Sequence, residues 1–199
     1  MIHLIGPGGA GKSTVGVALA TRLGCPVYDL DREFQRRRAD IDAFIGACDY
    51  KRYAREHVAV YLELVSHLPP SVLALSSGFM VYAESVHPAY AAVRDAIARS
   101  RSTVVLLPSL DRETCVAETV RRQVSRPFAR RDAAREEVVI RERFDRYKGL
   151  PALKVETMRP AHEVAAAIHV RLAADAAEAL PSAWRIPLPI ATPSNVACS

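Results

Sequence analysis

The amino-acid sequence predicts an α/β protein built around a mostly parallel β-sheet. Short apolar segments alternate with helix-like segments along the 199 residues, which is typical of strands that alternate with crossover helices. A glycine-rich segment, Gly6-Pro7-Gly8-Gly9-Ala10-Gly11-Lys12-Ser13, joins the first apolar segment to the first helix-like one. A strand followed by a glycine-rich turn and a helix is the context that such a segment requires.

The chain begins with a strand, a helix and a second strand. Residues 1–5 form an apolar segment that predicts the first strand. Residues 12–23 predict a helix, which ends at Gly24 because glycine readily adopts the left-handed conformation that closes a helix. Residues 26–28 predict a second, short strand.

Three helices and a third strand follow. Helices are expected at residues 31–38, 41–46 and 50–67. The last of them ends before Pro69-Pro70, because proline lacks the backbone N–H that a helix needs. Residues 72–75 predict the third strand.

The alternation continues in the second half of the chain. Helices are expected at residues 89–100, 112–123 and 136–146. The run with the most β-branched residues, 103–107, predicts a fourth strand, and residues 153–156 predict a fifth.

A long alanine-rich helix over residues 160–180 completes the predicted domain. Pro160 suits its first turn, where a missing N–H costs nothing. Four prolines then interrupt the chain, so residues 181–199 are interpreted as a proline-rich tail and residues 1–180 as one domain.

The composition is that of a globular protein, with half of the residues hydrophobic and a quarter charged. No apolar run reaches the roughly 18 residues of a membrane span, and no signal peptide is expected. The net charge is +5, and all but four of the 27 basic residues are arginine, which suits phosphate and carboxylate contacts. The four cysteines form no C-x-x-C pair, so we expect neither a disulfide nor a zinc framework, and a cytoplasmic location.

The glycine-rich segment matches the phosphate-binding pattern G-x-x-x-x-G-K-[ST]. Its glycines let backbone N–H groups approach a polyphosphate closely, and the following helix N-terminus favours negative charge. Lys12 is expected to reach the β- and γ-phosphates of a nucleotide, and Ser13 to offer its hydroxyl to Mg²⁺.

Several nucleotide-dependent classes do not fit the rest of the chain. The only asparagine, Asn195, lies in the tail, so the N-K-x-D sequence typical of a GTPase is absent. Neither residues 72–75 nor residues 103–107 run directly into the acidic residue expected of a motor or transport ATPase. Asp29 and Asp31 follow the second strand instead, and the carboxyl ends of parallel strands meet at one edge of a sheet. We expect one carboxylate to help hold Mg²⁺ and the other to accept a proton from a substrate hydroxyl.

Together, these residues resemble the shikimate kinase family of the nucleoside monophosphate kinase-like superfamily. The resemblance rests on the glycine-rich segment, on Asp29-Leu30-Asp31, on Ser76-Ser77-Gly78 after the third strand and on Arg126-Pro127. It implies a three-layer P-loop kinase fold with a five-stranded parallel sheet in the order 2-3-1-4-5, flanked by helices, and a lid at about residues 121–137. It also implies transfer of the γ-phosphate of ATP to a hydroxyl of a small molecule.

The resemblance assigns nucleotide-side roles to matching positions. Arg126 is expected to close over the transferring phosphate, and Arg122 and Arg159 to flank the adenine. Asp29 and Ser13 are expected on the metal side. The residues expected around the ATP phosphates are Gly8, Gly9, Ala10, Gly11, Lys12, Ser13 and Thr14.

Acceptor-side roles follow from the same resemblance. Asp31 is expected to contact the acceptor hydroxyl as a base, and Arg143 to bind a substrate carboxylate. A further substrate arginine falls on either Arg52 or Arg55, which lie three residues apart on one helical face. The triplet Ser76-Ser77-Gly78 is also expected to contact substrate.

The sequence departs from the family at this triplet, where the family has three glycines. The two serines add side chains to the pocket wall, and such a change can alter which substrate is accepted. The acceptor is therefore shikimate, or another polyol, cyclitol, sugar or natural product such as an antibiotic. A non-catalytic module that binds ATP or nucleic acid is the second alternative, although the arginines near residue 126 lack the interleaved aromatic residues of single-strand binders. We expect a monomer, a half-buried structural role for His57 and a core position for Cys115.

Overall fold

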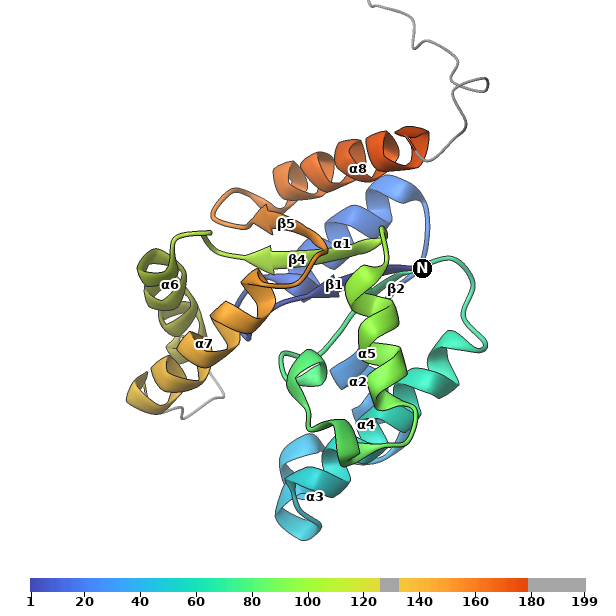
Figure 1. Ribbon diagram of the computed structural model, residues 1–199, viewed down its shortest axis with the longest axis vertical. Coiled ribbons are helices and arrows are strands. Elements are labelled where there is room, and N and C mark those ends of the chain that lie inside the picture. The colour runs from blue at the N-terminus through green and yellow to red at the C-terminus, as the bar shows by residue number, and fades with distance from the viewer. Residues whose placement is uncertain (126–132, 179–199) are drawn as a thin grey trace, which may run out of the picture.

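The computed structural model describes residues 1–125 and 133–178, and within them five strands form one sheet (Figure 1). All pairings are parallel, and the strand order is β2-β3-β1-β4-β5. The strands are β1 (Ile2–Ile5), β2 (Val27–Asp29), β3 (Val72–Ala74), β4 (Thr103–Leu107) and β5 (Leu153–Glu156). The predicted fold class and strand order are confirmed.

The described α-helices lie within three residues of their predicted bounds. They are α1 (Lys12–Leu23), α2 (Leu30–Arg37), α3 (Ile41–Ala47), α4 (Tyr50–Val65), α5 (Tyr90–Arg99), α6 (Arg112–Val124), α7 (Ala133–Lys148) and α8 (Ala161–Glu178). The largest difference is at α7, which begins at Ala133 and not at residue 136. The expected tail, the middle of the expected lid and Arg126 lie outside the described residues.

Two short 3₁₀ helices, η1 (Phe79–Val81) and η2 (Glu84–Val86), were not predicted. They lie between β3 and α5, where the Tyr90 hydroxyl donates to the Phe79 carbonyl at 2.6 Å and accepts from the Tyr82 N–H at 3.1 Å. The first of these turns is therefore held by a tyrosine from the next helix, and such a tertiary contact leaves no periodic signal in the sequence.

Helices cover both faces of the sheet, which explains why its strands are apolar without alternation. Val104 and Leu106 of β4 pack with side chains of α1 and α8, whereas Val105 and Leu107 pack on the opposite face with α4 and α5. Figure 1 shows α1 and α8 side by side along one face, with α2, α4 and α5 on the other. No helix among the described residues is long and apolar enough to cross a membrane.

The parallel sheet brings three loops together at the carboxyl ends of its central strands. β1 lies between β3 and β4, and β3 lies between β1 and β2. The glycine-rich loop after β1, the carboxylate of Asp29 at the end of β2 and the Ser76-Ser77 turn after β3 therefore share one edge. This is the edge at which open α/β sheets bind ligands.

His3 on β1 makes the stability of this fold sensitive to acid. Its side chain is buried, Nε2 lies 3.1 Å from the Tyr61 hydroxyl, and burial lowers its pKa to about 4. The unfolded chain takes up a proton at its ordinary pKa of 6.5, whereas the folded protein does so only near 4. Between these values the unfolded state binds more protons than the folded state. The free energy of unfolding should therefore decrease as the pH is lowered from 6.5 to 4, by at most about 3 kcal/mol.

Urea denaturation at about pH 7 and about pH 5 measures this effect. In His3→Gln the free energy of unfolding should depend less on pH, because the buried imidazole is gone. His67→Gln, at an exposed position, should keep the pH dependence of the wild type. An equal pH dependence in the wild type and in His3→Gln would contradict the assignment.

Candidate active site

The glycine-rich loop between β1 and α1 wraps around its own lysine. Lys12 Nζ donates to the carbonyls of Gly6 and Pro7 at 2.7 and 2.9 Å, so its ammonium group lies over the loop. Gly11 has a φ of 89°, a left-handed conformation that side chains disfavour, and it leads directly into the first turn of α1. Gly8 approaches Gln123 of α6 so closely that a Cβ there would collide with Nε2 of Gln123.

A polar cavity of about 180 Å³ opens beside this loop, and we call it the loop cavity. Its lining includes Gly8, Lys12, Ser13, Asp29, Asp31 and Ser77. Gly9, Gly11 and Thr14 also line it, and their expected contacts with phosphate stay a prediction. Ala10 does not: its side chain is fully buried and its N–H donates to the Pro7 carbonyl at 3.3 Å.

Ser13 and Asp29 meet in the loop cavity, where the sequence predicts the metal side of the site. Ser13 Oγ donates to Asp29 Oδ2 at 2.5 Å. Asp29 Oδ1 caps α2 by accepting from the N–H groups of Asp31 and Arg32 at 3.1 and 3.3 Å, so capping fixes the direction of the other oxygen. One hydroxyl and one carboxylate are hard oxygen donors that fit Mg²⁺, which usually completes its shell with phosphates and water. The described residues contain no cluster of three or more acidic, histidine or cysteine side chains.

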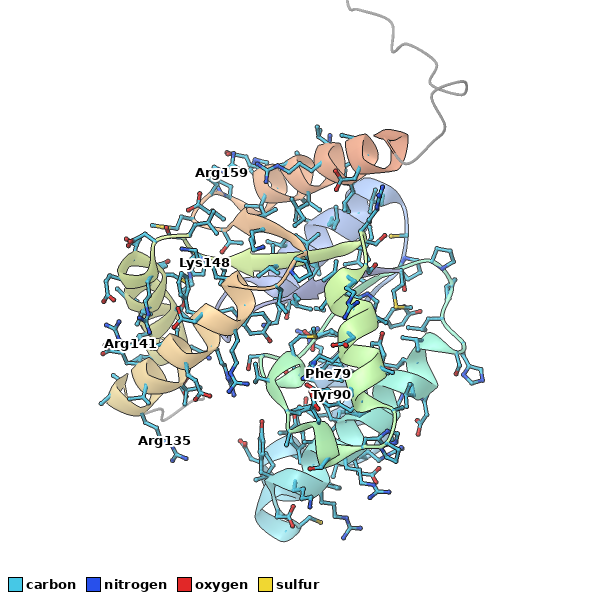
Figure 2. All side chains as sticks on the ribbon, viewed as in Figure 1. Phe79, Tyr90, Arg135, Arg141, Lys148 and Arg159 are labelled. Atoms are coloured by element: carbon cyan, nitrogen blue, oxygen red, sulfur yellow. The ribbon has the colours of Figure 1, made fainter. Side chains whose placement is uncertain are left out.

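Arg122 and Arg159, predicted to flank adenine, line one cavity on the other side of the loop together with Gly9, Gly11 and Thr14. Figure 2 shows Arg159 where β5 leads into α8. Arg122 Nη1 donates to the Gly9 carbonyl at 3.3 Å, and its Nε donates to Glu118 at 2.6 Å. Hydrogen bonds from Arg121 and Arg122 lower the pKa of Glu118 to about 2, so this carboxylate stays charged and holds Arg122 in place.

A second cavity, of about 340 Å³, lies between α2, α3, α4 and α7, and we call it the tyrosine cavity. Tyr50, Tyr53 and Tyr82 line it together with Asp31, Arg143 and the Ser76-Ser77-Gly78 turn. Asp31 and Ser77 line both this cavity and the loop cavity. The two cavities therefore meet at these two side chains.

The Ser77 turn is held by α7. Arg143 Nη1 donates to Ser77 Oγ at 3.1 Å, and the Tyr147 hydroxyl donates to the Ser77 carbonyl at 3.0 Å. Arg143 and Tyr147 lie one helical turn apart, so both reach the same turn. The guanidinium of Arg143 is thereby placed at the wall of the tyrosine cavity, where a substrate group could meet it.

Arg52 and Arg55 lie on the exposed face of α4 and line neither cavity. The inward face of this helix carries Tyr53 and His57, which are four residues apart and buried. Because Tyr53 faces the site, the helical period places Arg52 and Arg55 on the side of α4 that faces away from it. Their predicted contact with substrate stays a prediction.

His57 corrects one expectation, since its side chain is fully buried and not half-buried. Its Nε2 lies 3.2 Å from Asp31 Oδ1, so it belongs to the site. The spacing from Tyr53 to His57 was the available signal, but the sequence alone could not show that Asp31 of α2 faces this helix.

Gln123, buried on α6 and lining the loop cavity, was also missed, because nothing in the sequence marks it. Cys115 is buried, as expected.

Comparison with known proteins finds a family model and a curated relative that each cover most of the chain. The sequence model of the shikimate kinase family matches residues 8–173. The shikimate kinase of Thermobifida fusca is 33% identical over 166 residues, which cover 82% of this chain and 88% of that protein.

Solved structures agree with the fold. A shikimate kinase from Acinetobacter baumannii in complex with shikimate has a TM-score of 0.65 at 24% identity, covering 87% of this chain and 93% of that chain. A gluconokinase from Sinorhizobium meliloti has a TM-score of 0.56 at 17% identity, covering 89% and 93%. These proteins therefore share one fold, although their names specify different acceptors.

Proposed function

This chain belongs to the shikimate kinase family, ATP-dependent phosphotransferases that act on a hydroxyl, and on that premise we propose that its acceptor is a small polyhydroxylated metabolite bound in the tyrosine cavity. The observation that supports this most directly is the junction of the two cavities at Asp31 and Ser77. A triphosphate tail held by the glycine-rich loop would end at this junction. A hydroxyl bound in the tyrosine cavity would reach the same point.

The chain's own groups suit phosphoryl transfer at this junction. Loop N–H groups and Lys12 would bind the phosphate oxygens, where charge develops during transfer. Asp31 would orient the acceptor hydroxyl and take its proton as the new bond from oxygen to phosphorus forms. The bond from the γ-phosphorus to the bridging oxygen breaks in the same step, and ADP leaves.

Ser13 and Asp29 are the residues that would hold Mg²⁺. When bound, this ion would neutralise phosphate charge. We further propose that Arg122 and Arg159 flank the adenine, that Arg126 closes over the transferring group, and that the protein acts as a cytoplasmic monomer.

The lining of the tyrosine cavity bears on which acceptor it takes. Arg143 is the only cationic side chain among the described residues that line it, and it could bind a carboxylate such as that of shikimate. The carboxylates of Asp40 and Asp42 and the hydroxyls of Ser76 and Ser77, which also line the cavity, favour an acceptor rich in hydroxyl groups. A neutral polyol or cyclitol is therefore the second candidate beside shikimate.

An ADP-release assay with ATP and Mg²⁺ over shikimate, quinate, cyclitols, sugars and nucleosides tests the proposal. We expect one acceptor to raise ADP release at least about tenfold above hydrolysis by water, because productive alignment of both substrates should outcompete water. Phosphorus NMR of the product should show a phosphate monoester and ADP in equal amounts. Tight ATP binding without acceptor-dependent ADP release across the panel would contradict the proposal and favour a non-catalytic ATP-binding module.

A further inference from the structure

The imidazole of His57 is enclosed by aromatic rings on α4, α2 and the segment after β3. The ring centroids of Phe34, Tyr53, Phe79 and Tyr82 lie 5.5, 5.1, 6.0 and 6.3 Å from it. Figure 2 shows Phe79 beside Tyr90 in the interior of this part of the molecule. Leaving a buried ring nitrogen unpaired costs free energy, so both nitrogens of His57 need partners.

The partner of Nδ1 is the hydroxyl of Tyr82, at 3.1 Å. Burial raises the pKa of this hydroxyl well above its ordinary value, so Tyr82 keeps its proton and can donate it to Nδ1. A nitrogen that accepts a hydrogen bond carries no proton in the neutral imidazole. The ring proton then sits on Nε2.

The partner of Nε2 is Oδ1 of Asp31, at 3.2 Å. Both atoms are buried, and neither has a hydrogen bond within the described residues, so the 3.2 Å contact is a close approach of two polar atoms that each still need a partner. The Asp31 side chain as a whole remains 44% exposed. One carboxylate oxygen is thus turned inward against His57, while the side chain still lines both cavities.

We propose that His57 is a positioning residue for Asp31, itself fixed by Tyr82. Nε2–H donates to Oδ1 and holds the carboxylate at the junction of the two cavities. The second carboxylate oxygen is left to accept the proton of the acceptor hydroxyl. This inference rests on the proposed function for the role of Asp31, but the hydrogen-bond chain from Tyr82 through His57 to Asp31 can be tested without it.

Two substitutions of His57 separate this role from simple core packing. The amide of glutamine can place an N–H near the position of Nε2, whereas asparagine is shorter and reaches only the position of Nδ1. His57→Gln should therefore keep the contact with Asp31, and His57→Asn should lose it. Core packing alone predicts a difference in stability, because asparagine leaves the larger void, but no difference in kcat between two variants that are both folded.

Steady-state kinetics and thermal unfolding of the two variants give the first test. His57→Asn should lower kcat by about 10- to 100-fold, because the carboxylate of Asp31 loses its orientation. The KM for ATP should change less than about threefold, because nucleotide binding is not affected. His57→Gln should retain kcat within about fivefold. Equal losses in the two folded variants, or an unchanged kcat in His57→Asn, would overturn the proposal.

Tyr82→Phe tests the contact between the Tyr82 hydroxyl and His57 Nδ1, and it has a matched control. It should lower kcat by about 3- to 10-fold with KM for ATP unchanged, because Nδ1 loses its donor. Tyr61→Phe removes a second buried tyrosine hydroxyl that contacts a histidine, His3, away from the site, and should leave kcat unchanged. Equal effects of the two substitutions on kcat would count against the proposal.

Nitrogen-15 NMR of labelled protein gives a test that needs neither an acceptor nor a His57 variant. Two-bond proton–nitrogen correlations should place the His57 ring proton on Nε2 in the wild type, and Tyr82→Phe should shift the population toward the other tautomer. A proton on Nδ1 in the wild type would refute the hydrogen-bond chain even if a kinase activity is found. If no acceptor raises ADP release but the proton is on Nε2, the proposed function is refuted and the hydrogen-bond chain is not.

Discussion

Replacing Lys12 by alanine is expected to lower kcat/KM for phosphoryl transfer by about 10³-fold or more. The ammonium group of Lys12 lies at the wall of the loop cavity, held by two loop carbonyls at 2.7 and 2.9 Å. Alanine removes the positive charge that would face the β- and γ-phosphates. Because the side chain is only partly buried, the protein should stay folded. Acceptor-dependent ADP release and circular dichroism measure the two parts of this prediction.

Lys148→Ala is the matched control for this substitution. Lys148 also donates from Nζ to a main-chain carbonyl, that of Leu110, at 3.0 Å, but it lies at the end of α7 away from both cavities (Figure 2). It should lose no more than about threefold in kcat/KM, as expected of an exposed substitution away from the site. Full activity in Lys12→Ala would remove the phosphate-binding role of the loop.

Asp31→Asn is expected to lower kcat by about 10²- to 10⁴-fold while KM for ATP changes less than about threefold. Asparagine keeps the size of the side chain but cannot take a proton from the acceptor hydroxyl. The nucleotide contacts expected of Lys12, Ser13 and Asp29 are left in place. Initial rates with both substrates varied separate kcat from the two KM values.

Asp95→Asn controls for the removal of one negative charge. Asp95 is a half-buried aspartate on α5 that pairs with Arg94 and Arg99 and lines neither cavity, and its substitution should leave kcat unchanged. An equal loss of turnover and ATP affinity in Asp31→Asn would show that Asp31 serves the nucleotide and not the acceptor hydroxyl.

Much of the fold could be predicted from local patterns, because those patterns report strong local physics. Gly24 ends α1 and the Pro69-Pro70 pair follows α4, as their backbone constraints require. The apolar run of residues 103–107 becomes the fully buried β4. The phosphate-binding side of the site was predictable for the same reason, since its residues lie in one continuous segment from Gly6 to Ser13.

The acceptor side was harder to predict, because its residues come from segments far apart in the sequence. The tyrosine cavity takes side chains from α2, α3, α4 and α7 and from the turn after β3. Which face of α4 turns inward depends on packing against Phe34 and Phe79, and that packing brings in Tyr53 and His57 and leaves Arg52 and Arg55 outside. A count of residue spacings along one helix could not choose between these faces.

The sequence by itself determined the strand–loop–helix proposed to bind a polyphosphate, the two aspartates after the second strand and the family to which they point. These are short-range features, in which a few neighbouring residues fix the backbone. Only the tertiary structure decided that Asp31 meets a buried histidine and that Arg143 and Tyr147 grip the Ser77 turn. Those contacts join residues 26 to 70 positions apart, and the packing of helices on the sheet sets them, not the local conformation of the chain.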